Sequence, residues 1–119
     1  MKTIVKLGAQ GDVMIRRVVT LPPDAREMKR NGPIIVAHSE TGHHHVIEAP
    51  HVKHYETDNP LIGYLVDIPG SKAPVDLIHQ RSFDTHETIR LDNPEGGVAI
   101  WQVIRGREHT PEGWRRTQD

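Results

Sequence analysis

The chain has 119 residues, which is enough for one domain with a modest hydrophobic core. It contains no cysteine, which excludes disulfide bonds, thiolate zinc sites and a cysteine nucleophile. The formal net charge is −1 with neutral histidines, and the nine histidines would make the chain strongly positive in acid. The near-zero charge and the scarcity of aromatic residues argue against nucleic acid as the main partner.

No apolar run is long enough to span a membrane, and the N-terminus lacks the core of a signal peptide. We therefore expect a cytoplasmic protein with no membrane partner. No linker divides the sequence. Residues 1–119 are expected to form a single β-domain, with residues 107–119 as a tail for packing or interaction.

Valine and isoleucine occur in short bursts, a pattern typical of β-strands because branched side chains suit a pleated sheet. Breaks rich in glycine, proline, asparagine and aspartate separate the bursts. In chain order, nine strands are predicted over residues 3–7, 12–20, 34–38, 44–48, 52–56, 61–68, 75–79, 88–91 and 98–105.

Many short strands at regular spacing predict an all-β fold, namely a small antiparallel β-sandwich or barrel of the jelly-roll type. The runs 61–68 and 98–105 are almost continuously apolar, as expected of central strands covered on both faces. At most one short helix is expected, over residues 24–30, with Asp24 as its N-cap and Gly32 as its end.

A run of three histidines, His43-His44-His45, lies at the start of the predicted strand 44–48. Side chains alternate along a strand, so His43 and His45 should point to one face and His44 to the other. Two imidazoles at this spacing can bind a single metal ion, and Thr41-Gly42 before them is good turn chemistry. The alternative is an exposed histidine turn without a ligand.

Other histidines have simpler interpretations. His44 is expected to face solvent or an interface, because alternation points it away from its neighbours. His51 and His54 flank a predicted edge strand and are interpreted as surface residues.

Three segments carry a family resemblance: Gly11-Asp12-Val13, the run Ser39-Glu40-Thr41-Gly42-His43-His44-His45, and residues 107–116. The chain resembles a family of small uncharacterised β-proteins of bacteria and bacteriophages with GDV, TGHxH and REYTPEGWRR-like motifs. His109 stands where the family pattern has tyrosine. The resemblance implies that Gly42, His43 and His45 form one part of a site and that His86 forms the other.

The residues themselves agree with this division, because His86 directly precedes a predicted strand, and His79 is the next candidate. Neutral imidazole suits a divalent metal, with zinc or iron as the expected ion. Nearby carboxylates could complete or orient the ligand shell. The candidate metal ligands are His43, His45, His86 and His79, and the candidate carboxylates are Glu48, Asp84 and Glu87.

Enzyme signatures are missing: the sequence has no glycine-rich phosphate loop, no H-E-x-x-H and no G-x-S-x-G. We therefore expect a binding or structural component of a larger assembly, such as a virion if the chain is phage-encoded, with other proteins or a second copy as partner. Trp114, Arg115 and Arg116 are the expected interface residues. The alternative is a cupin-like metal-dependent enzyme, because His43, His45 and Glu48 resemble the first cupin motif.

Overall fold

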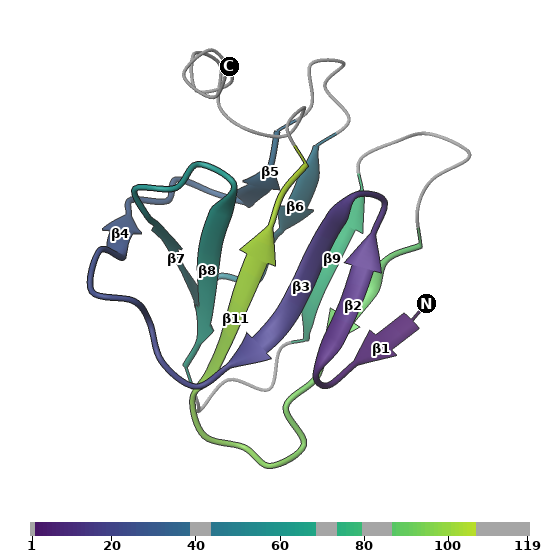
Figure 1. Cartoon of the computed structure of the whole chain (residues 1–119). Helices are drawn as coiled ribbons and strands as arrows, with labels where there is room; N and C mark the ends of the chain where they lie inside the picture. Colours follow the sequence, from purple (N-terminus) through teal and green to yellow (C-terminus); the bar gives the residue numbers. More distant parts are fainter. Residues whose placement is uncertain (1, 39–43, 69–73, 80–86, 107–119) are drawn as a thin grey trace.

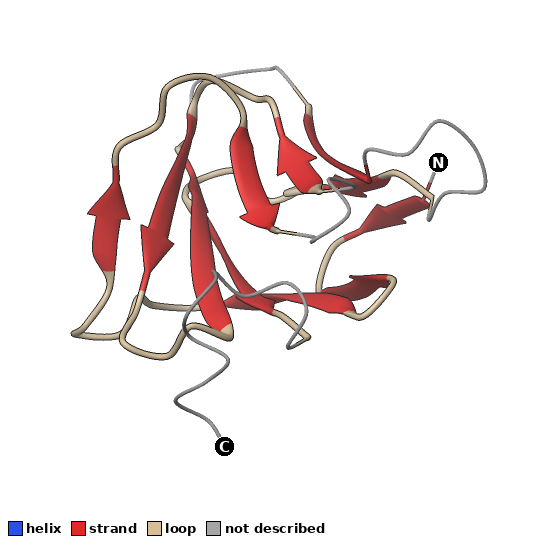
Figure 2. Ribbon diagram, turned by 90° about the horizontal axis from the view of Figure 1, so that it is seen from above, coloured by secondary structure: helices blue, strands red, loops and turns tan. Residues whose placement is uncertain are grey.

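The computed structural model describes residues 2–38, 44–68, 74–79 and 87–106. These residues form eleven strands in two sheets that pack on one another (Figures 1 and 2). The predicted all-β sandwich is therefore confirmed. In the described part of the chain there is no helix, and so none that could cross a membrane.

The smaller sheet has five strands in the order β1-β10-β9-β6-β5. The β1–β10 pair is parallel and every other pair in this sheet is antiparallel. Its strands are β1 (Lys2–Ile4), β10 (Ile89–Leu91), β9 (Val75–His79), β6 (His45–Ile47) and β5 (Ile34–Ala37).

The larger sheet has six strands in the order β2-β3-β11-β8-β7-β4, all paired antiparallel. The two strands at its centre, β11 and β8, are the apolar runs that the sequence predicts to be central. Its strands are β2 (Leu7–Gln10), β3 (Val13–Val18), β11 (Ala99–Ile104), β8 (Ile62–Asp67), β7 (Val52–Glu56) and β4 (Arg26–Met28).

The first predicted strand, residues 3–7, is divided in the structure. Its first half is β1 in the smaller sheet, and its end begins β2 in the larger sheet. Gly8 lies inside β2, where a Cβ atom would come within 2.7 Å of the Ile4 side chain. The absence of a side chain at Gly8 thus lets Ile4 pack inward where the chain passes from one sheet to the other.

The helix expected over residues 24–30 is wrong. Arg26–Met28 forms strand β4, which pairs with His54–Glu56 at the edge of the larger sheet. All three side chains of β4 are exposed, so the segment has no apolar stripe that a helix could bury. Arg26 adds a hydrogen bond from Nη1 to Asp58 Oδ1 at 2.8 Å.

Alternation along β11 fills the core between the sheets. Ala99, Trp101 and Val103 are each at most 1% exposed, and Trp101 is the largest fully buried side chain. The guanidinium carbon of Arg17 lies 5.6 Å from the centre of the Trp101 ring, within the range of a cation–π contact. The few aromatic residues of the chain thus include one that anchors the core.

Arg105 directly follows β11 and joins the two sheets. Its Nε donates to the Val36 carbonyl of β5 at 2.7 Å, while Nη1 and Nη2 donate to the two carboxylate oxygens of Glu56 on β7 at 2.9 and 2.5 Å. Gly63 on β8 leaves room for this pair, because a Cβ atom there would lie 2.5 Å from Arg105 Nη2. Nη1 also donates to the Pro60 carbonyl at 3.2 Å.

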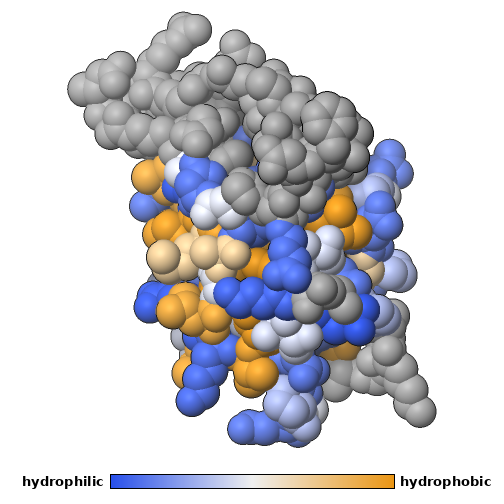
Figure 3. Space-filling view, turned by 90° about the vertical axis from the view of Figure 1, so that its right-hand side faces the viewer, coloured by the Kyte–Doolittle hydropathy of each residue, from blue (hydrophilic) through white to orange (hydrophobic). Residues whose placement is uncertain are grey.

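Apolar side chains on the surface are spread over several elements. Figure 3 shows apolar and polar residues interspersed on the face that it presents. On that face, the described residues form no single broad apolar area of the kind that marks many protein interfaces. Among the described residues, the large apolar residues that are exposed are Val5, Leu7, Met14, Val19, Met28, Ile68 and Val98.

The buried Arg105–Glu56 pair should be far more important for stability than the exposed Arg26–Asp58 pair. Replacing Arg105 by methionine leaves the partly buried Glu56 carboxylate without its main partner, and we expect a loss of about 3 kcal/mol in the free energy of unfolding. Arg26→Met breaks a pair whose side chains are 60% and 75% exposed and should leave the urea midpoint almost unchanged. Equal midpoints for the two variants would contradict this ranking.

Candidate functional site

Two of the four predicted metal ligands lie together in the smaller sheet. His45 on β6 and His79 on β9 are directly paired in the antiparallel register. Their imidazole rings stack with centroids 4.3 Å apart and an angle of 10° between planes. His45 is only 1% exposed, so the pair combines a deeply buried ring with a partly buried one.

Gln10 of the opposite sheet fixes the orientation of His45. The Gln10 Nε2 group donates to the carbonyls of Leu77 and Glu87, both at 2.9 Å, so the amide oxygen faces the other way. That oxygen, Oε1, lies 2.7 Å from His45 Nδ1, which must therefore carry the hydrogen. The neutral ring then has its lone pair on Nε2, the atom that can accept a hydrogen bond or bind a metal.

The other predicted site residues are not brought to this pair by the described structure. Glu48 follows β6 and is exposed, and the Glu87 side chain is also exposed, although its carbonyl holds Gln10. Within residues 2–38, 44–68, 74–79 and 87–106, no three histidine, aspartate or glutamate side chains are arranged to hold a metal ion. Outside the described residues lie His43, His86, Asp84, Trp114, Arg115 and Arg116.

A second group of histidines surrounds a cavity of about 290 Å³ beside the Arg105–Glu56 pair. His38 and His54 line it, and His54 Nε2 lies 2.5 Å from Glu56 Oε2. The His38 ring packs edge-on against His44, with centroids 5.3 Å apart. Apolar atoms of Met28, Ile35 and Pro60 complete the wall.

The ionisation of this cavity follows from its surroundings. Burial raises the pKa of Glu56, but hydrogen bonds from His54 and Arg105 outweigh burial, and the net pKa is lowered. The pKa of His38 is lowered by burial first, then by His44 and Arg105. At neutral pH the cavity therefore holds the ionised Glu56 carboxylate, which orients His54, and a neutral imidazole at His38. A carboxylate and a neutral imidazole in one cavity are suited to proton exchange with a small ligand.

The sequence interpretation missed this second group. His51 and His54 were expected at the surface, but their side chains are only 14% and 15% exposed. For His54 the reason is that β7 is not an edge strand at this point, since β4 pairs outside His54–Glu56. The spacing of His54 and Glu56, two residues apart in a strand, was the available signal, because such residues share one face.

Acid should destabilise the protein in two steps. Folding lowers the pKa of His38 below its ordinary value of 6.5, so the unfolded chain binds the proton first and stability should fall as the pH drops below that value. Glu56, lowered from 4.5, should add a further loss below about that pH by the same reasoning. Urea denaturation across pH would measure both steps.

In the His38→Gln variant, the loss of stability assigned to His38 should become smaller, while the loss at lower pH assigned to Glu56 should stay the same. An unchanged profile between pH values of about 7 and 5 would show that His38 contributes nothing to it.

Comparison with known proteins places the chain in a family without a known role. No curated protein and no solved structure matches it significantly. The profile of a domain of unknown function, DUF8820, matches residues 9–105, which include Gln10, both histidine groups and Arg105. Because this match covers most of the sequence, the chain belongs to the DUF8820 family.

Proposed function

We propose that this protein is a binding domain that holds a divalent metal ion through His45 and His79 and serves as a component of a larger assembly, not as an enzyme. The observation that carries the metal assignment is the hydrogen bond from His45 Nδ1 to Gln10 Oε1 at 2.7 Å. Metal-binding histidines are commonly fixed in this way, with one ring nitrogen donating to a nearby oxygen and the other binding the ion.

The burial of two polar side chains, Gln10 and His45, supports a binding role. Gln10 and His45 are each 1% exposed, in the interior of a small sandwich where apolar residues would pack without any demand for hydrogen bonds. Burial of polar groups costs stability unless every group is satisfied. A polar set at this position is therefore better explained by binding than by packing alone.

Zinc or iron is the proposed ion, because neutral imidazole suits both. His43 and His86 are the proposed further ligands, with water as the alternative, and Asp84 and Glu87 are the proposed outer carboxylates. Rings that share one ion tilt towards it, so metal binding should alter the present stack of His45 on His79. Glu48 and Glu87 are both exposed, but the Glu87 carbonyl accepts a hydrogen bond from Gln10, which contacts His45. Glu87 is therefore included and Glu48 is not. The exposure of Glu48 also puts the cupin-like enzyme second, because that alternative needs Glu48 beside His45.

The assembly role is supported by the sequence resemblance to bacteriophage proteins and by the tail that contains Trp114, Arg115 and Arg116. A tryptophan with flanking arginines is common at protein interfaces. The proposed partner is a second copy or another protein, in a virion if the gene is phage-encoded and otherwise in the cytoplasm.

Metal analysis of protein purified without a histidine tag tests the metal assignment. We expect about one zinc or iron ion per chain, and His45→Gln or His79→Gln should each weaken zinc binding at least about tenfold. His44→Gln is the matched control, because His44 adjoins His45 in sequence but packs on the His38 ring. Loss of metal in the control alone, or tight zinc binding by the His45→Gln, His79→Gln double variant, would refute the assignment.

Light scattering with size-exclusion chromatography tests the assembly role separately. We expect the full chain to self-associate or to be captured into a defined complex, whereas a strict monomer with metal would favour the enzyme alternative.

A further inference from the structure

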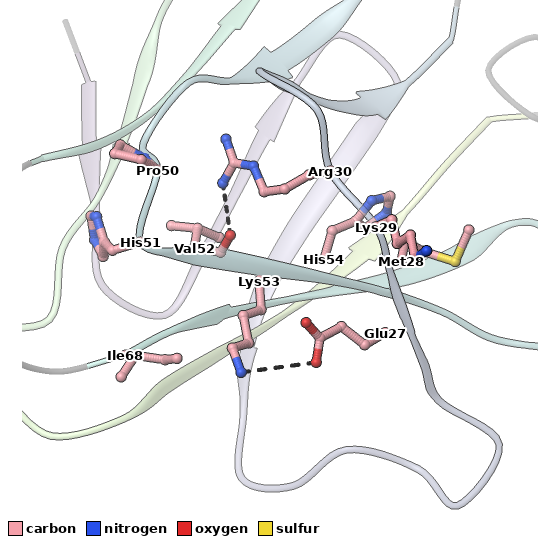
Figure 4. Close-up of a pocket in the computed structure, with 10 residues that line it drawn as sticks. All are labelled: Glu27, Met28, Lys29, Arg30, Pro50, His51, Val52, Lys53, His54 and Ile68. Carbon is pink, nitrogen blue, oxygen red and sulfur yellow. Dashed lines mark hydrogen bonds and ion pairs between the residues drawn. The ribbon is translucent and has the colours of Figure 1, made fainter.

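A cavity of about 400 Å³ lies where strand β4 leaves the edge of β7 (Figure 4). We call it the edge pocket, and the lining residues used below are Met28, Lys29, Arg30, His51, Lys53 and Ile68. It lies against the larger sheet, whereas the His45–His79 pair lies in the smaller one, so the two are different sites.

The edge pocket exists because β4 is shorter than β7. β4 pairs with His54–Glu56 only, which leaves the start of β7 without a neighbouring strand on the side away from β8. The side chain of Arg30 takes this place: its Nη1 donates to the carbonyls of Ala49 and Val52, both at 2.7 Å, and its Nε donates to Gly32 at 3.0 Å. These acceptors are neutral, and no described carboxylate lies within ion-pair distance of Arg30.

Two further cations add to this charge. Lys29 is exposed at the pocket and has no ion-pair partner among the described residues. Lys53 Nζ lies 3.9 Å from Glu27 Oε1, and both side chains are about half exposed, so water screens this pair strongly. Three cations and one carboxylate therefore line a pocket in a chain whose net charge is −1.

His51 supplies the observation that points to a ligand. Its side chain is 14% exposed, and its buried Nδ1 has no hydrogen-bond partner among the described residues. The other ring nitrogen, Nε2, lies 2.9 Å from Asp67 Oδ1 and so already faces a carboxylate. Buried polar atoms are normally satisfied, so a ligand oxygen that accepts a hydrogen bond from His51 Nδ1 would remove this deficit.

We propose that the edge pocket binds a small organic anion whose oxyanion group, a phosphate or a carboxylate, contacts Lys29, Lys53 and His51. The apolar part of the ligand packs on Met28 and Ile68, which also line the pocket and are 41% and 38% exposed. Lysines bind an oxyanion as point charges, and Arg30 adds positive potential while its hydrogen bonds stay with the backbone.

Phenyl phosphate is the first probe, titrated at low ionic strength into the full chain with histidine and amide chemical shifts as the readout. Benzoate tests whether a carboxylate can replace the phosphate group. Inorganic phosphate lacks the aromatic ring and so tests the contribution of the apolar part, and benzyl alcohol lacks the negative charge and so tests the contribution of the oxyanion. We expect phenyl phosphate to shift the resonances of His51 and Lys53, to bind more tightly than inorganic phosphate, and to outcompete benzyl alcohol.

The double variant Lys29→Ala, Lys53→Ala should weaken phenyl phosphate binding about tenfold or more. Its matched control is Lys2→Ala, Lys6→Ala, which removes the same charge elsewhere and should leave the affinity unchanged. Arg30 is left intact because it holds the backbone of the pocket. His51→Leu, checked for an unchanged melting temperature, should also weaken binding.

The proposal is overturned if phenyl phosphate does not bind, if both double variants lose affinity equally, or if benzyl alcohol binds as well as phenyl phosphate. If inorganic phosphate binds as tightly as phenyl phosphate, the proposed apolar contacts of the ligand are wrong.

Discussion

The ion pair between Arg105 and Glu56 is the interaction on which the rest of this structure depends. A buried charge pair is stable only when further hydrogen bonds satisfy its remaining groups, and here the carbonyls of Val36 and Pro60 do so. The pair lies in the six-stranded sheet and fixes the Arg105 guanidinium, whose Nε donates to the Val36 carbonyl of β5 and so links the two sheets, and the same carboxylate orients His54. The fold and the smaller histidine cavity thus share one anchoring group, so the cavity cannot be altered at Glu56 without an effect on the sandwich.

Most of the strands were predictable because their signal is local. Bursts of β-branched residues between turn residues mark a strand whatever its partner, and the apolar runs that became β8 and β11 carry the signature of central strands in their own composition. The failures lie where pairing decides the structure. β4 has only three residues and no apolar pattern, and it is a strand only because β7 offers an edge to it. The separation of β1 from β2 likewise depends on which sheet each joins.

The candidate sites divide in the same way. His45 was predicted from its own run, and His79 proved to lie opposite it in register. Gln10, 35 residues away from His45, gave no local signal, because a glutamine in a strand is unremarkable until the sheets are packed. Arg105 and Glu56, 49 residues apart, were hidden for the same reason. His43 and His86, outside the described residues, stay predictions.

The Arg30 side chain has a consequence for the solubility of the protein. Exposed strand edges are templates on which another chain can add a strand, and this is a common start of aggregation. The Val52 carbonyl would be such an open acceptor at the start of β7, but the Arg30 guanidinium already donates to it. The neighbouring edge strand β4 carries Arg26 and Glu27, whose charges also disfavour a second chain. This corner of the larger sheet is therefore closed to edge-to-edge pairing by side chains where no strand is present to close it.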